Sequence, residues 1–245
     1  QKYYAFDVTD YPRSGEMIPL FTEMEELFRH RSPIPATDEF PRLNPSLPAY
    51  QFPAQIFSVE RQQVNLHPDR VRSIKDALLG TRRPQYTSSG GQGGEIEVRR
   101  FNQWSSFSRL LDRRELDMLF SQAVMQYVED LNAAYLAQFS WLRSGGWVSH
   151  QIDLSAHETA ATWNAHWTYS DAVWRIIRGQ KPYFLSRHPL SAHLASMRRS
   201  GFTIVKVLKG SQPGGVTRRQ LAPRYRMMSD DDLQTRRAFV LARKP

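Results

Sequence analysis

The densest group of side chains that could do chemistry lies between positions 150 and 166. Three of the seven histidines fall there, His150, His157 and His166, together with Asp153. A histidine can accept a proton near neutral pH, so it is suited to removing the proton of a substrate hydroxyl. We predict that the general base is one of the three, in the order His150, His166 and His157, with Asp153 as a further catalytic residue.

Two other interpretations of these residues stay open. Imidazole and carboxylate are good ligands for transition metals, so His150, Asp153 and His157 could serve a metal-dependent hydrolase. Because a strand end and a loop do not give them a fixed spacing, we expect no metal site. Alternatively, the histidines are structural and hydrogen-bond to an aromatic cap. The tryptophans of that cap are Trp163, Trp167 and Trp174.

Residues 116–154 are predicted to form strand, helix and strand, which is one βαβ unit. The strands are expected at Leu116–Ser121 and Trp147–Ile152, and Asp130 can cap the helix between them. The Gly145-Gly146 pair is expected to end that helix. Polar residues that follow the two strands lie where open α/β sheets bind ligands, beyond the carboxyl ends of the strands.

Strands and helices alternate over most of the chain, and this predicts an α/β fold with a mainly parallel sheet covered on both faces. Further strands are expected at 3–8, 96–101, 202–208 and 238–242, and further helices at 16–29, 68–80 and 189–200. We expect a single domain over residues 1–245. Six prolines between Ser32 and Pro53 favour an irregular insertion or lid at 30–94, and the aromatic, polar segment 155–188 is expected to form a cap on the acceptor side.

Composition excludes several classes of protein. The chain has 245 residues, 40% of them hydrophobic, which is enough for a packed core. It has no cysteine, so it has no disulfide, no thiolate nucleophile and no cysteine-based zinc site. With no apolar run long enough to span a bilayer and no signal pattern at the start, we expect a cytoplasmic protein.

Positive charge is concentrated in one part of the chain. The net charge is +9, and no acidic residue occurs from Ala172 to Ser229. Such a bias can attract an anionic substrate, a nucleic acid or an acidic membrane surface, or it can be a solvated basic face. No recognition-helix or aromatic RNA-binding motif is present, so the pattern does not favour nucleic acid.

Several segments resemble class I S-adenosylmethionine-dependent methyltransferases. They are YYAFDV, LDMLFSQAVMQYVEDL, LRSGG with VSHQIDL, LSAHLASMRRSGF, LAPRYRMMSDDDL and AFVLARKP. The resemblance covers residues 95–245 and 1–28. It implies a Rossmann-like, doubly wound sheet with an antiparallel C-terminal strand, and S-adenosylmethionine as cofactor.

The resemblance also implies which residues hold that cofactor. Asp7 would bind the ribose hydroxyls, and Ser121 and Gln122 would border the methionine part. The adenine would be held by residues of one short segment, Asn102, Gln103 and Trp104.

The chain departs from the family pattern in three places. Nothing before Gln1 supplies the first strand and its glycine-rich loop, and we expect both to lie upstream. The glycine-rich segment 88–95 does not follow a strand and open a helix, so we interpret it as a flexible loop. Gln126 and Tyr127 stand where relatives often carry Glu-His.

The sequence therefore predicts a methyltransferase that acts on an oxygen of a small-molecule or glycan acceptor, which the basic span suggests is anionic. The first alternative is a non-catalytic binding module of the same fold that uses its basic C-terminal region. The second is the metal-dependent hydrolase named above.

Overall fold

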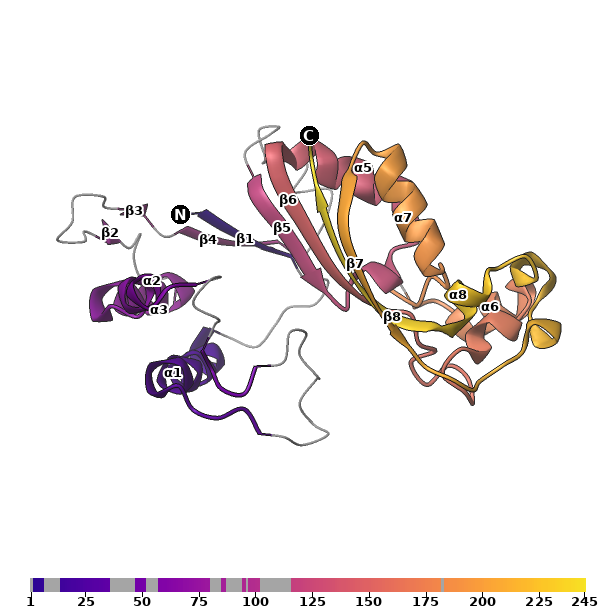
Figure 1. Ribbon diagram of the computed structural model, residues 1–245, viewed down its shortest axis with the longest axis horizontal. Coiled ribbons are helices and arrows are strands. Elements are labelled where there is room, and N and C mark those ends of the chain that lie inside the picture. The colour runs from indigo at the N-terminus through magenta and orange to yellow at the C-terminus, as the bar shows by residue number, and fades with distance from the viewer. Residues whose placement is uncertain are drawn as a thin grey trace. The chain divides into compact units, whose positions relative to one another are not determined.

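The computed structural model describes residues 2–6, 14–35, 47–51, 57–79, 85–86, 94–95, 97–101, 116–181 and 183–245. The chain divides into two compact units, Gln1–Phe107 and Ser108–Pro245 (Figure 1). Each unit is described by itself.

The described residues of the first unit form two short sheets and three helices. Strand β1 (Lys2–Phe6) pairs in parallel with β4 (Glu97–Phe101), and β2 (Gln85–Tyr86) pairs antiparallel with β3 (Gly94–Glu95). The helices are α1 (Ser14–His30), α2 (Val59–Asn65) and α3 (Pro68–Leu79). The predicted strands near positions 3 and 97 and the predicted helices at 16–29 and 68–80 are confirmed.

Helix α2, which lies within the segment 30–94 and after its six clustered prolines, was not predicted. Ser58 caps this helix by accepting a hydrogen bond from the backbone N–H of Arg61 at 3.3 Å. A carboxylate on α1 joins the first and third helices: Glu25 accepts from Lys75 Nζ at 3.1 Å.

The second unit is built on a four-stranded sheet in the order β5-β6-β8-β7 (Figure 1). The strands are β5 (Leu116–Gln122), β6 (Leu142–Asp153), β7 (Thr203–Ser211) and β8 (Thr235–Arg243). Strands β5 and β6 are parallel, while β8 is antiparallel to both β6 and β7. The predicted α/β class is thus confirmed: the sheet is mixed, and its C-terminal strand β8 is antiparallel to its neighbours as predicted.

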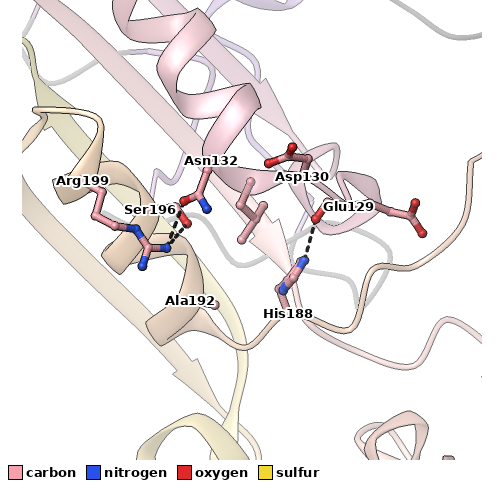
Figure 2. Close-up of a pocket in the computed structure, with 8 residues that line it drawn as sticks. Glu129, Asp130, Asn132, His188, Ala192, Ser196 and Arg199 are labelled. Atoms are coloured by element: carbon pink, nitrogen blue, oxygen red, sulfur yellow. Dashed lines mark hydrogen bonds between the residues drawn. The ribbon is translucent and has the colours of Figure 1, made fainter. Parts of the chain in front are cut away.

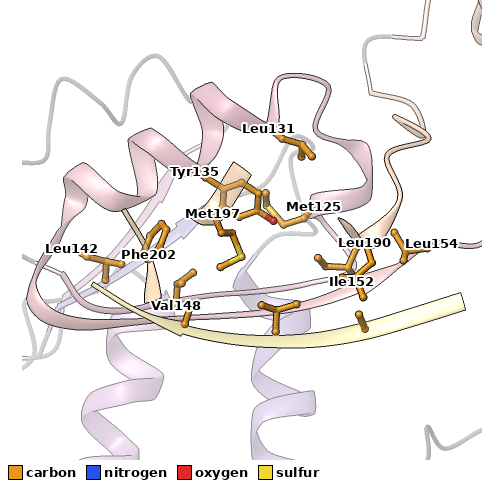
Figure 3. Packing of buried hydrophobic residues seen from close by; sticks show 13 residues of the cluster. Met125, Leu131, Tyr135, Leu142, Val148, Ile152, Leu154, Leu190, Met197 and Phe202 are labelled. Carbon is orange, nitrogen blue, oxygen red and sulfur yellow. The ribbon is translucent and has the colours of Figure 1, made fainter. Parts of the chain in front are cut away.

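Helices α5 (Leu131–Trp141) and α7 (Leu190–Arg199) pack against each other and against the sheet. Asp130 caps α5 as predicted, accepting from the N–H of Ala133 at 2.9 Å. The core beneath these helices is shown in Figure 3. The members labelled there are Met125, Leu131, Tyr135, Leu142, Val148, Ile152, Leu154, Leu190, Met197 and Phe202.

The other face of β5 is exposed. Side chains alternate along a strand, so Leu119 packs against the core while its neighbours Met118 and Phe120 point to the opposite face. Phe120 is 75% exposed there.

The Gly145-Gly146 pair does not end the helix, so this prediction is wrong. Helix α5 ends at Trp141, and β6 begins at once at Leu142. The pairing of β5 with β6 is irregular near Leu116, and a Cβ on Gly146 would lie 3.2 Å from the Leu116 carbonyl oxygen. Gly145 has φ +76°. Because glycine has no side chain, these two residues allow the irregular first part of β6 to lie close to β5.

A second, smaller core joins the segment 155–188 to the segment 216–233. Its members are Trp167, Leu221, Ala222, Tyr225 and Met228. The first of these segments contains the 3-10 helix η2 (Ala165–Thr168) and helix α6 (Asp171–Arg178), and the second contains η3 (Arg218–Gln220), η4 (Pro223–Tyr225) and the start of α8 (Asp230–Gln234). We call these two segments together the cap.

Arg187 contacts both segments of the cap. Its guanidinium donates to the Tyr169 carbonyl oxygen at 2.8 Å and to Asp171 Oδ1 at 2.7 Å. It also lies over the rings of Trp174 and Tyr225, at 4.6 and 5.4 Å from their centroids. Burial lowers the pKa of this guanidinium, but it stays charged because an arginine titrates far above neutral pH.

Candidate active site

The carboxyl ends of β5 and β6 form one edge of the sheet in the second unit, which we call the carboxyl edge. Ser121 pairs with His150 and Gln122 with Gln151 in the parallel register. The chain then leaves β5 through Ala123, which has φ +53° and donates its N–H to the Gln151 carbonyl oxygen at 2.9 Å. The predicted polar residues therefore do lie side by side.

Backbone strain is concentrated at this edge. Five non-glycine residues in the described part of the chain have positive φ, and three of them follow β5 or β6. They are Ala123, His157 and Glu158, with φ values of 53°, 44° and 64°. Such conformations cost about 1–3 kcal/mol each and cluster at functional sites.

His150 is fully buried and has no free ring nitrogen. Its Nδ1 lies 2.7 Å from Ser121 Oγ, and its Nε2 lies 2.9 Å from Gln138 Oε1 of helix α5. Burial lowers the pKa of this imidazole to about 3, so it is neutral at physiological pH. The prediction of His150 as the leading base does not fit this geometry, because a base must reach the proton that it removes.

His166 is also buried, in the core of the cap. Its ring lies 4.5 Å from that of Trp167, and Nδ1 has no partner in the described part of the chain. Burial, with smaller contributions from Arg187 and His157, lowers its pKa to about 3. This environment agrees better with the structural alternative, a histidine packed into an aromatic cap.

His157 is the one of the three predicted histidines that is exposed. Its Nε2 lies 3.6 Å from Asp153 Oδ2, and 30% of its side chain is accessible. The Asp153 carboxylate is itself held, since Oδ1 accepts from the backbone N–H of Ser155 at 2.9 Å. The ring of Tyr127 lies 5.8 Å from the imidazole. The structure thus brings Asp153 and His157 together at the carboxyl edge and keeps His150 and His166 away from solvent.

The residues predicted to hold a cofactor are only partly described. Gln122 is exposed at the end of β5, and the Ser121 hydroxyl is engaged by His150. The remaining four, Asp7, Asn102, Gln103 and Trp104, lie outside the described residues.

One residue next to this edge has unmet hydrogen-bonding capacity. Gln126 is buried, and neither atom of its side-chain amide has a partner among the described residues. A buried amide without partners is costly, by about 1–3 kcal/mol. A buried polar group of this kind calls for an explanation, such as an ordered water, a bound ion or a bound ligand.

A cavity of about 290 Å³ opens at the same edge, where β6 and β7 end and β8 begins. It is lined by Asp153, Gly210, Ser211, Gln212, Pro213, Arg236 and Arg237. Arg236 donates to Gln212 Oε1, whereas the Arg237 side chain forms no ion pair or hydrogen bond with the described residues. Among these residues the cavity therefore offers an unpaired guanidinium, on the strand position paired with Asp153, whose carboxylate faces His157.

A second cavity, of about 360 Å³, lies between the start of α5 and helix α7 (Figure 2). Its polar groups are already paired with one another: His188 Nε2 contacts the Glu129 carbonyl oxygen at 2.8 Å, and Arg199 donates to Asn132 Oδ1 at 3.0 Å. We interpret it as a polar crevice between two helices.

Two kinds of feature are absent from the described residues. These residues contain no group of three or more His, Asp or Glu side chains that could hold a metal ion. None of the helices in the described ranges is long and apolar enough to cross a bilayer. The proposed hydrolase site would also need His150, both of whose ring nitrogens are hydrogen-bonded.

Comparisons with known proteins found similar structures but no similar sequences. No family model and no curated protein matches the chain. Among solved structures, it is similar to an S-adenosylmethionine-dependent methyltransferase from Mesorhizobium loti, with 19% identity over 64% of this chain and 73% of that chain and a TM-score of 0.38. A methyltransferase of the same kind from Methanosarcina mazei has 13% identity over 70% and 78% of the two chains and a TM-score of 0.40.

A third similar structure is phosphoethanolamine N-methyltransferase 2 from Haemonchus contortus, solved with S-adenosyl-L-methionine. It has 13% identity and a TM-score of 0.37, and the match covers 61% of this chain and 37% of that one. These three similar structures are thus methyltransferases. With identities below 20% and TM-scores of 0.40 or less, they do not decide its activity or its acceptor.

Proposed function

We propose that the chain is an S-adenosylmethionine-dependent methyltransferase that methylates an oxygen of a small-molecule or glycan acceptor at the carboxyl edge. The sequence segments quoted above and the sheet order β5-β6-β8-β7 support this class. The observation that carries the proposal is the pair of His157 and Asp153 at that edge, on a strained backbone and open to solvent.

S-adenosylmethionine, when bound, supplies a methyl group on a positively charged sulfur. The task of the protein is then to align the acceptor hydroxyl and to take its proton. His157 is suited to this role: with Nε2 facing Asp153, Nδ1 is left to accept the proton. Asp153 would stabilise the imidazolium that forms, as a carboxylate does beside other catalytic histidines.

The cavity at the carboxyl edge supports an anionic acceptor. Arg237 has no partner of its own there, and Asp153 joins the cavity to His157. A guanidinium binds a carboxylate or a phosphate through two parallel hydrogen bonds. An acidic sugar or a phosphorylated small molecule would meet this requirement.

On the cofactor side, Gln122 and Ser121 would border the methionine part. His150 then has a positioning role, because its Nδ1 contacts Ser121 Oγ at 2.7 Å and fixes that hydroxyl. The buried amide of Gln126 lies four residues beyond Gln122 and is a further candidate to contact the ligand. Asp7, with the segment 102–104, would hold the nucleoside, as the sequence resemblance implies.

The base assignment is tested with His157→Asn and Asp153→Asn. Turnover can be measured as S-adenosylhomocysteine released from S-adenosylmethionine in the presence of a small-molecule cell extract. Loss of a general base typically costs a factor of about 10²–10⁴, so kcat should fall by that factor for His157→Asn and by less for Asp153→Asn. Affinity for S-adenosylhomocysteine should not change.

His30→Gln is the matched control, since His30 is exposed at the end of α1 in the other unit. It should turn over at the wild-type rate. Wild-type turnover by His157→Asn would rule out His157 as the base.

A further inference from the structure

Helix α6 turns apolar side chains away from the protein. Trp174 is its buried residue, yet Ile176 is 80% exposed and Val173 is 41% exposed. With about 3.6 residues per turn, Ala172, Val173 and Ile176 form one strip on the side away from Trp174. A surface helix normally points its apolar stripe into the core and its polar residues outward, so this strip is unusual.

A second exposed apolar residue lies in the neighbouring loop of the cap. Met227 is 93% exposed. Its loop is fixed beside α6, because Arg224 donates to Asp171 at 2.7 Å and Arg187 is held between the rings of Trp174 and Tyr225. The cap therefore presents apolar side chains from two segments, and we call Ala172, Val173, Ile176 and Met227 the apolar strip.

Most charged residues around the apolar strip are basic, and the carboxylate at the start of α6, Asp171, is paired with Arg187 and Arg224. The span from Ala172 to Ser229 contains twelve lysines and arginines and no acidic residue. Three of the twelve, Arg175, Lys181 and Arg226, form no ion pair within the described part of the chain and flank the strip in sequence. Apolar side chains among unpaired cations fit a partner that is both anionic and able to take up alkyl groups.

We infer that the apolar strip docks on the surface of an anionic lipid bilayer. Basic residues attract the headgroups, and Ile176 and Met227 enter the boundary between headgroups and acyl chains. A nucleic acid would account for the charges but not for the exposed isoleucine and methionine. A second copy of the chain would bring the same positive charge to the contact, so it is a poorer partner. The inference stands whether or not the proposed methyl transfer is correct.

Co-sedimentation with lipid vesicles tests the inference on the purified full chain. The wild type should bind vesicles of equal parts phosphatidylglycerol and phosphatidylcholine, bind pure phosphatidylcholine much more weakly, and be released by added salt. Burying an isoleucine contributes about 1.5–3 kcal/mol, so Ile176→Ser should weaken binding by about 10- to 100-fold. Arg175→Gln should weaken it by about fivefold, since each basic residue near the surface contributes about 1 kcal/mol.

Leu136→Ser is the matched control, because Leu136 is an exposed leucine of α5 that lies outside the cap. It should bind vesicles like the wild type. Equal binding to charged and neutral vesicles, or unchanged binding by Ile176→Ser, would overturn the inference. So would a DNA duplex that binds in place of vesicles, or a change of oligomeric state in Ile176→Ser.

Discussion

Acid should destabilise the second unit through three buried histidines, His150, His166 and His193. Burial is the main reason that the pKa of each imidazole is lowered to about 3. In the unfolded chain a histidine has a pKa of about 6.5. Between these values the unfolded state binds protons that the native state does not, so stability is complete above about pH 6.5 and falls as the pH drops toward 3.

The size of the effect follows from the two pKa values. Lowering the pH from about 7.5 to about 5.5 costs about 1.4 kcal/mol for each histidine, and about 4 kcal/mol for three. That is a large part of the 5–15 kcal/mol by which domains are usually stable. Carboxyl groups titrate mainly below this range, so the histidines should dominate the loss.

Urea unfolding followed by tryptophan fluorescence measures this loss, because five of the six tryptophans lie at or after Trp141 and report on the second unit. His150→Asn should lower stability at both pH values but remove about one third of the pH dependence. His30→Gln, an exposed control, should keep all of it. A fall in the free energy of unfolding of less than about 1 kcal/mol between the two pH values would contradict the low pKa values of the buried histidines. A pH dependence of stability that is unchanged in His150→Asn would contradict them as well.

Three further predictions concern the framework of the site. Ser121→Ala leaves Nδ1 of His150 buried without a partner and should lower the free energy of unfolding, measured by thermal unfolding, by about 1–3 kcal/mol. Ser144→Ala, at an exposed serine, is the control and should change it by less than about 0.5 kcal/mol. Gly146→Ala places a Cβ 2.9 Å from the Arg143 carbonyl oxygen within β6 and 3.2 Å from the Leu116 carbonyl oxygen of β5, and should cost about 1–3 kcal/mol; full stability would contradict the crowding around Gly146. Arg187→Lys removes the planar guanidinium that donates to both Tyr169 and Asp171. This substitution should speed amide hydrogen exchange in residues 165–188 without changing exchange in the sheet.

Elements with local signals could be predicted from the sequence. The strand predicted at 116–121 and the N-cap predicted at Asp130 depend only on local sequence, and both are confirmed, the strand one residue longer than predicted. The Gly145-Gly146 pair was misread because a glycine pair after a helix resembles a helix stop. Only the neighbouring strand, which comes close to Gly146, shows that the pair belongs to β6.

The predicted ranking of the three histidines as general base does not fit the structure, for a similar reason. Val148, His150 and Ile152 alternate along β6, and this period of two was a signal that His150 shares the buried face. Its partner Gln138 comes from a helix, and that contact depends on tertiary packing. The second core, in which Trp167 meets Tyr225, joins segments more than fifty residues apart, and no local pattern reveals such a contact.

Calorimetry of S-adenosylhomocysteine with the full-length protein tests whether the chain binds the cofactor product of a methyltransferase. We expect saturable binding to one site per chain, weakened by Gln122→Ala and unchanged by His157→Asn. Absence of binding to the folded, full-length protein would show that the chain is not an S-adenosylmethionine-dependent enzyme.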